Sequence, residues 1–425
     1  MRSNSWRGRS TRNSSANDGY VARIDTRCSV LDAVGRDAEG TSGNDRDVRR
    51  GTGTMKAERR DAPGQWWHES APVRPAALGP RLFAVGWPRR TLVLTGLALL
   101  LLGVILAATA WGSVRIPVGT IVRMVALRLG LPVGVADWPA SWETIIFTIR
   151  LPRVLLAGIV GSSLALSGAT YQGLFRNPLA DPYLIGVASG AALGATAATV
   201  LQLPAPFYRI GATQWCAFAG ALLAVALVYG LARVGGATPL TALLLAGVAV
   251  SALASAATSF LMYWHGEKLL AVYGWLLGGF STASWAQVLQ VAPYLALGTV
   301  ALIPTARLLD ALQLGEEGAL TLGIDVERLK IVLVIVATLV TAAAVSVSGL
   351  IGFVGLIVPH ITRLLWGANH RLLLPASLLG GAIFLIVADG IARSILRTGE
   401  IPVGVLTALC GAPFFLILLR RGLKS

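Results

Sequence analysis

The chain has 425 residues, of which 55% are hydrophobic and 13% are charged, and its formal net charge at pH 7 is +15. A water-soluble domain carries charge on about 25% of its residues, so this composition excludes an ordinary soluble protein and indicates one that crosses a membrane several times. The basic excess is typical of the cytoplasmic loops of membrane proteins. No basic stripe with interleaved aromatic residues accompanies it, so it does not indicate nucleic-acid binding.

The first expected unit is residues 1–88, which are rich in Arg, Asp, Ser, Gly and Asn and lack hydrophobic periodicity. Such a segment cannot bury enough apolar surface to offset the entropy lost on folding. The sequence therefore predicts a disordered basic cytoplasmic tail. A start codon assigned too far upstream is the alternative interpretation.

The second expected unit is residues 89–425, an all-α membrane domain in which apolar segments of bilayer-crossing length recur. Each segment must be helical, because lipid offers no hydrogen-bond partner to an open backbone. A further segment, 268–280, is apolar but too short to span, and we expect it to lie along the membrane surface. The ten predicted spans are 91–111, 152–174, 183–203, 212–232, 240–263, 285–306, 330–348, 350–366, 372–392 and 402–419.

The orientation of the spans follows from the charges before the first one. Arg81, Arg89 and Arg90 favour a cytoplasmic amino terminus, since basic residues collect on that side of the membrane. Ten spans then return the carboxyl terminus to the cytoplasm as well.

Charged side chains at the span ends are the first functional candidates. Arg150 and Arg153 lie on one helical face, and no acid is nearer in the sequence than Glu143, so we expect both to be unpaired and exposed. They could anchor the helix among lipid headgroups or bind an acidic partner. Asp389 could pair with Arg393, four residues later. An acid inside the membrane is a candidate for a proton-coupling role. For Asp389 we favour the other interpretation, a structural ion pair with Arg393.

The fifth span places small residues four apart, at Gly247, Ser251, Ser255 and Ser259. This stripe fits either tight helix packing or the wall of a polar passage, because membrane serines often bond to their own helix. The cysteines and histidines match no metal-ligand spacing. A phosphate-binding GxxxxGK[ST] loop is absent from the sequence, so we expect no bound metal, no cofactor and no enzymatic activity.

Six motifs occur in a fixed order along residues 91–425. The longest, residues 150–195, reads RLPRVLLAGIVGSSLALSGATYQGLFRNPLADPYLIGVASGAALGA. The others are LLLAGVAVSAL (243–253), LGEEGALTLGIDVERLK (314–330), SGLIGFVGLIVPHITRLL (348–365), NHRLLLPASLLGGA (369–382) and GEIPVGVLTALCGAPFFLILLRR (399–421). Together they resemble the FecCD-type family, the permease subunits of bacterial ABC importers for iron-siderophore, haem and cobalamin.

The resemblance implies a type II importer permease of ten spans per subunit in the cytoplasmic membrane. It implies a homodimer surrounded by lipid, with the pathway on the two-fold axis, two ATP-binding subunits that use the ATP, and an extracytoplasmic substrate-binding protein. An iron-siderophore is the first expectation for the cargo, with cobalamin or haem as alternatives. A secondary transporter driven by an ion gradient is the alternative of another class, but it would need buried paired acids, and Asp389 is the one candidate.

The resemblance also implies roles for particular residues. The binding protein would dock on Arg150, Arg153 and Arg393. The loop at about 307–330 would couple to the ATPase, and its part QLGEEGALTLGIDVERLK (313–330) reads as two short helices broken at Gly323. The coupling residues would be Leu314, Gly315, Glu316, Ala319, Leu322 and Gly323. The inner gate would be formed by Thr238, Pro239 and Thr241, and Pro239 departs from the family pattern. The pathway would continue along Gly247, Ser251, Ser255 and Ser259.

Overall fold

The computed structural model describes residues 87–422, except residues 113, 133–136, 205–210, 234, 236–237 and 397–398. The predicted tail therefore lies, but for its last two residues, outside the described part of the chain. All regular structure in the described part is helical, which confirms the all-α prediction. The helices are α1 (Trp87–Ala110), α2 (Val118–Arg128), α3 (Ala140–Thr144), η2 (Ile145–Arg150), α4 (Leu151–Leu174), η3 (Pro182–Ile185), α5 (Val187–Val200), α6 (Ala212–Ala232), α7 (Leu240–Trp264), η4 (Gly266–Lys268), α8 (Leu269–Leu276), α9 (Trp285–Leu302), α10 (Ala306–Leu312), α11 (Glu316–Thr321), α12 (Val326–Ser348), α13 (Val354–Trp366), α14 (His370–Ile395) and α15 (Val403–Gly422).

The ten predicted membrane segments each contain a helix. Among the described residues, seven helices are long and apolar enough to cross a bilayer: α1, the continuous helix of α3, η2 and α4, and then α6, α7, α9, α12 and α14. Three shorter apolar helices, α5, α13 and α15, account for the remaining segments. The segment 268–280 forms the eight-residue helix α8, which is too short to span, as expected.

Two of the short helices begin later than the sequence predicts. Helix α5 starts at Val187 rather than residue 183, because the 3₁₀ turn η3 and the left-handed Gly186 (φ 87°) come first. Helix α13 starts at Val354 rather than residue 350, because Phe353 has a φ of 69°. A non-glycine residue in this left-handed region is uncommon, and hydropathy carries no sign of it.

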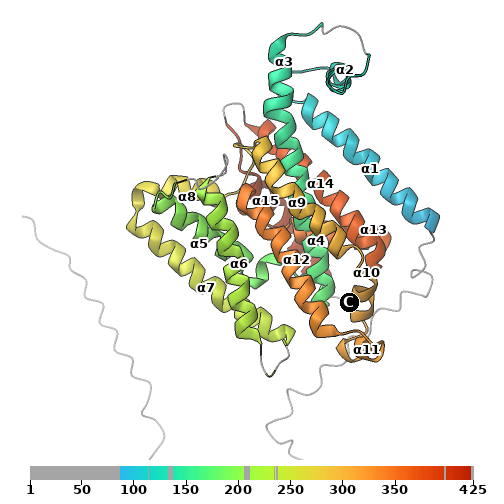
Figure 1. Ribbon diagram of the computed structural model, residues 1–425, viewed down its shortest axis with the longest axis vertical. Helices are drawn as coiled ribbons and strands as arrows, with labels where there is room; N and C mark the ends of the chain where they lie inside the picture. The colour runs from blue at the N-terminus through green and yellow to red at the C-terminus, as the bar shows by residue number, and fades with distance from the viewer. Residues whose placement is uncertain are drawn as a thin grey trace, which may run out of the picture. The chain divides into compact units, whose positions relative to one another are not determined.

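Helix α4 forms the centre of the bundle, with α12, α13, α14 and α9 packed around it (Figure 1). Nearly its whole length is buried. A Cβ atom added to Gly161 would collide with the carbonyl of Gly381 in α14, and one added to Gly168 would collide with the carbonyl of Gly355 in α13. Small residues let helix backbones approach this closely in a membrane, where dispersion contacts rather than hydrophobic burial hold helices together.

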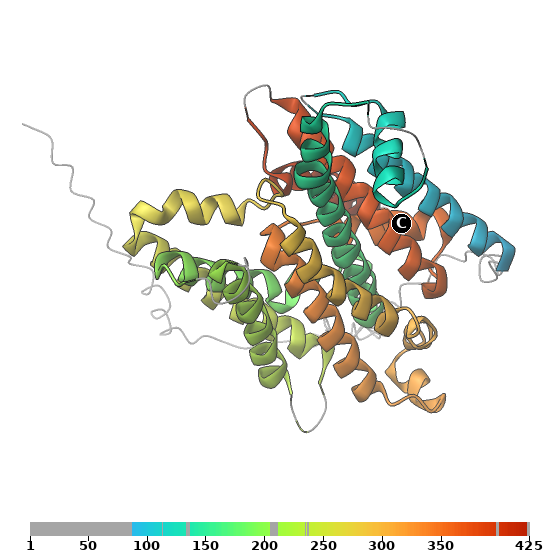
Figure 2. The same cartoon turned by 45° about the horizontal axis from the view of Figure 1, so that its top comes forward.

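The polar segments of the bundle lie at its two ends. Helices α2 and α3, with the start of α4, lie at the top of Figure 1, while α11 lies toward the bottom beside the start of α12, with α10 above it. The turned view in Figure 2 keeps the same separation, with α5, α6 and α7 as a group beside the central helices. We call the end with α2, α3 and the start of α4 the arginine end, because Arg150 and Arg153 lie there. We call the opposite end, with α10 and α11, the α11 end.

Candidate functional site

Asp389 is the centre of the arginine end. Its carboxylate, 1% exposed, accepts hydrogen bonds from Arg153 Nη2 at 2.8 Å and from Arg153 Nε at 3.1 Å. Arg393 Nε lies 3.1 Å from the other carboxylate oxygen. The expected pair with Arg393 is therefore confirmed, and Arg153 makes it a triad. Helix α4 supplies one arginine, and α14 supplies the acid and the other arginine one turn later.

Glu400 adds a second acid to this cluster. Its carboxylate accepts a hydrogen bond from Arg153 Nη1 at 2.9 Å and is 44% exposed. Arg153 thus spans two carboxylates that lie 236 and 247 residues away in the sequence. The sequence analysis missed Glu400, because nothing in the local pattern around Arg153 points to an acid that far along the chain.

Arg150 binds backbone carbonyls at the end of helix α1 rather than a carboxylate. Its guanidinium donates to the carbonyls of Thr109 at 3.1 Å, Ala110 at 3.2 Å and Val114 at 2.6 Å. The last carbonyls of a helix have no partner within it and carry the negative end of the helix dipole. Arg150, which ends the π-helical segment η2, satisfies these groups and ties α1 to the start of α4.

The expectation that Arg150 and Arg153 are unpaired and exposed is therefore wrong. Arg150 is 5% exposed, and the side chain of Arg153 is 11% exposed. The physical reason is that a buried cation must be paired or hydrogen-bonded, and both find partners that are distant in the sequence. The three arginines Arg150, Arg153 and Arg393 and the two acids Asp389 and Glu400 together carry a single net positive charge.

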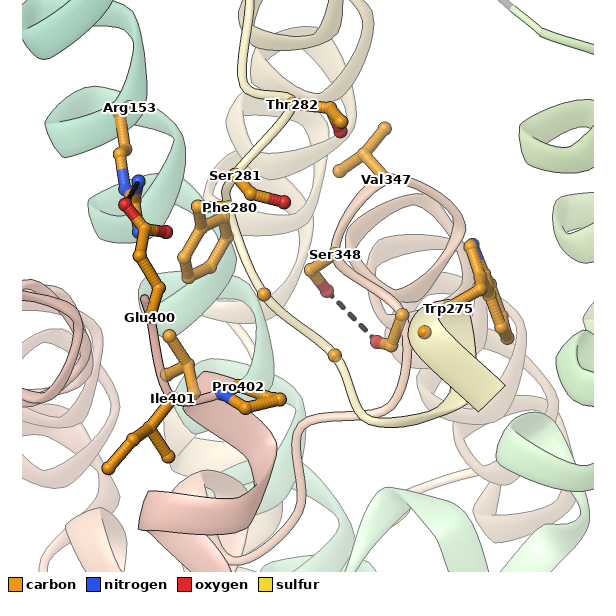
Figure 3. A pocket seen from close by; sticks show the side chains of 15 residues that line it. Arg153, Trp275, Phe280, Ser281, Thr282, Val347, Ser348, Glu400, Ile401 and Pro402 are labelled. Atoms are coloured by element: carbon orange, nitrogen blue, oxygen red, sulfur yellow. Dashed lines mark hydrogen bonds and ion pairs between the residues drawn. The ribbon is translucent and has the colours of Figure 1, made fainter. Parts of the chain in front are cut away.

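Two cavities meet at the Arg153–Glu400 ion pair. One, of about 570 Å³, is lined by all three arginines together with Trp111 and Ser394. The other, of about 370 Å³, lies between Arg153 and the end of α12 at Ser348. Figure 3 shows Arg153 and Glu400 facing each other along one side of this second cavity, with Phe280 and Ser281 beside them. The ion pair therefore forms part of the wall of both cavities.

The α11 end carries the six expected coupling residues. Ala319 is buried and anchors α11, while Leu314 and Leu322 are 71% and 61% exposed. Gly315 (φ 101°) and Gly323 (φ 77°) bound the helix. The break at Gly323 lies where the sequence predicts it, between α11 and α12. The second helix is the long α12 rather than a short one, and a further short helix, α10, precedes α11.

The expected gate residues lie at the same end, where α7 begins. Thr238 is 1% exposed, whereas Pro239 and Thr241 are exposed. Thr238 also binds two charged side chains of α12, Glu327 and Lys330, which the sequence analysis did not select.

The small-residue stripe of α7 changes character along its length. Gly247 is buried, with the carbonyl of Leu184 close against it, and Ser189 Oγ donates to Ser251 Oγ at 3.1 Å. Ser255 and Ser259 are exposed. The first half of the stripe therefore packs against α5 and the turn before it, and the second half is free on the surface of this single chain.

Comparison with known proteins agrees with this arrangement. The model of the FecCD transport family matches residues 99–421. The chain belongs to the FecCD transport family. It is 46% identical over 329 residues to the cobalamin import system permease protein BtuC of Halobacterium salinarum, an alignment that covers 74% of this chain and 88% of that protein.

Two further similarities place the chain among ABC transporter permeases. It is 46% identical over 286 residues to the hemin transport system permease protein HmuU of Yersinia pestis, covering 66% of this chain and 84% of that one. A solved metal-chelate type ABC transporter in an inward-facing conformation has a TM-score of 0.68 at 34% identity, covering 78% of this chain and 99% of the other. This FecCD protein is accordingly an ABC-type permease that crosses the membrane several times.

The triad at the arginine end gives a first testable prediction. Replacing Asp389 with Asn leaves two largely buried guanidinium groups beside each other with Glu400, on Arg153, as the one acid that still pairs with them. Breaking a buried ion pair from one side costs about 3–5 kcal/mol. We expect a matching loss of unfolding free energy, measured by denaturation in detergent micelles.

Asp137→Asn is the matched control for this prediction. Asp137 pairs with Arg123 at 3.0 Å, but both side chains are largely exposed, and such pairs contribute about 0.2–1 kcal/mol. Equal losses in the two variants would show that Asp389 is not a buried structural charge.

Proposed function

We propose that this FecCD protein is the membrane subunit of an ATP-driven importer that carries a metal chelate across the cytoplasmic membrane. It would work as a homodimer with two ATP-binding subunits and an extracytoplasmic binding protein, with both termini in the cytoplasm. The observation that carries the proposal is the separation of two polar ends by an apolar bundle. One end has arginine-lined cavities, and the other has a short helix with exposed leucines.

The cargo proposed first is an iron-siderophore, and cobalamin and haem are the alternatives. The cobalamin and hemin permeases similar to this chain support the class of metal chelates rather than one member of it. No group of three or more potential metal ligands occurs among the described residues. None is needed in this proposal, because the chelator already satisfies the metal.

Transport driven by an ion gradient is less well supported by the geometry. Such a mechanism needs a buried acid that can gain and lose a proton during the cycle. Asp389 instead lies between Arg153 and Arg393, and each of its carboxylate oxygens is paired with one of these guanidinium groups. The triad therefore favours a structural role for Asp389.

The arginine end is the proposed docking surface for the binding protein. Arg153 and Arg393 line the larger cavity, and Glu400, which pairs with Arg153, is accessible from it. We infer that an arriving carboxylate replaces Glu400 on Arg153, so that docking exchanges one ion pair for another. Arg150 would support this surface indirectly, by holding the end of α1. Charge complementarity of this kind mainly sets the rate and the register of docking.

The α11 end is the proposed contact with the ATP-binding subunits. Leu320 on the short helix is 57% exposed, and Leu314 and Leu322, which lie just beyond its two ends, are also exposed. Exposed apolar patches rimmed by polar residues mark protein interaction sites. We infer that α11 inserts into a cleft of the ATPase and that the turn at Thr238–Thr241 gates the pathway along α7.

Uptake by proteoliposomes tests the proposed function. The permease is reconstituted with the ATP-binding subunits and the binding protein encoded beside it, and cyanocobalamin, haemin and a ferric siderophore are offered in turn. We expect uptake of one chelate that requires ATP, the ATP-binding subunits and the binding protein together. Uptake driven by an imposed ion gradient without ATP would contradict the proposal.

Gly323 allows a test of the coupling assignment with a matched pair of variants. Its φ of 77° costs a β-branched side chain about 1–2 kcal/mol or more, whereas Asn tolerates this conformation. No atom lies within 4 Å of the position that a Cβ atom would occupy, so backbone strain alone distinguishes the two variants. We expect Gly323→Val to lower uptake per ATP hydrolysed and Gly323→Asn to keep it. Unchanged coupling in Gly323→Val would count against the assignment.

A further inference from the structure

Lys330 is a buried charge in the second turn of α12, near the α11 end. Its side chain is 2% exposed, although its position at the end of a charged, polar stretch of sequence suggests a solvated residue. A buried ammonium must be paired and hydrogen-bonded to be tolerated. The identity of its partners therefore shows which parts of the bundle it holds together.

Three partners from three parts of the fold surround the ammonium. Lys330 Nζ lies 2.8 Å from Glu316 Oε2 in the first turn of α11 and 2.9 Å from Glu327 Oε1 in its own helix. It also donates to the carbonyl oxygen of Thr238 at 3.3 Å, in the turn before α7. One side chain thus joins α11, α12 and the entry to α7.

The peptide groups of Thr238 are held on both sides. Its N–H donates to Glu327 Oε2 at 3.2 Å, and its carbonyl accepts from Lys330. Its hydroxyl donates to the hydroxyl of Tyr229 in α6 at 3.1 Å. The turn can therefore not shift relative to α12 without breaking hydrogen bonds to charged groups, which are about twice as strong as neutral ones.

We propose that Lys330 transmits movement of α11 to the turn at Thr238–Thr241, so that a displacement of the coupling helix repositions the start of α7. This inference rests on the proposed function, which assigns α11 to coupling and the turn to the gate. A shift of Glu316 away from Lys330 would leave a buried ammonium short of one charge partner. The ammonium therefore follows Glu316, and the peptide of Thr238 follows the ammonium. Lys330 acts as a positioning residue, since it touches no cargo.

The exposure of the two glutamates allows the connection from α11 through Lys330 to Thr238, which we call the link, to be tested without loss of the fold. The side chains of Glu316 and Glu327 are 38% and 36% exposed, so both carboxylates remain solvated when the ammonium is removed. Lys330→Met keeps an unbranched side chain that is one atom shorter and removes the charge. Glu316→Gln severs the connection to α11 alone, and Glu317→Gln, an exposed acid in the same helical turn, is the matched control.

The experiment follows the gate directly and needs no cargo. The complete transporter, in a variant without its three native cysteines, carries Thr241→Cys as a reporter in lipid nanodiscs. Its maleimide labelling rate is measured with and without a non-hydrolysable ATP analogue, and ATP hydrolysis is measured in parallel. We expect a change of about fivefold or more in the labelling rate for the parent protein and for Glu317→Gln. We expect this change to disappear in Lys330→Met and Glu316→Gln, while ATP hydrolysis continues in Lys330→Met, whose side chain is buried in the bundle and away from the proposed ATPase contact.

The outcomes separate the link from the function that it serves. If the labelling rate of the parent transporter is the same with and without the nucleotide, the gate assignment and the link are both overturned. A parent that responds, with Lys330→Met and Glu316→Gln responding equally, would overturn the link and leave the proposed function standing. Parallel loss of the response and of ATP hydrolysis in both variants would show a merely structural role and would also overturn the link.

Discussion

At each end of this bundle, a buried charged side chain lies between two side chains of opposite charge, an arrangement that we call a clamp. The arrangement of the helices depends on these two clamps. At the arginine end, the carboxylate of Asp389 lies between Arg153 and Arg393. At the α11 end, the ammonium of Lys330 lies between Glu316 and Glu327. An apolar bundle tolerates an ionised group only where such partners replace water. The clamps therefore fix which helices meet at each end.

The two clamps join different sets of helices, and this difference has a functional consequence. The arginine-end clamp ties α14 to α4, whose backbones already touch through Gly161 and Gly381. These two helices pack closely against each other within the bundle. The other clamp ties the short helix α11 to α12 and to the turn before α7, across segments that pack less closely. A movement imposed at α11 would thus reach α7 while the α4–α14 pair keeps its geometry.

Sequence reasoning found the features that depend on local spacing or on hydropathy. The ten apolar segments follow from helix length and bilayer thickness, and the pair of Asp389 with Arg393 follows from the four-residue helical repeat. Contacts between distant parts of the chain could not be found in this way. Arg153 appeared unpaired because its acids lie far along the chain, and the contact of Lys330 with Thr238 joins residues 92 positions apart. The late starts of α5 and α13 depend on left-handed residues that hydropathy does not detect.

Accessibility of the two ends from the two sides of the membrane is the most direct test of this account. In a variant without Cys28, Cys216 and Cys410, the permease carries Ser394→Cys beside the arginine-lined cavity or Leu320→Cys on α11. Intact spheroplasts are treated with a membrane-impermeant maleimide. The account predicts that Cys at 394 reacts from outside and is protected by the binding protein, while Cys at 320 reacts only after the membrane is opened. Reaction at 320 from outside, with 394 shielded, would contradict it.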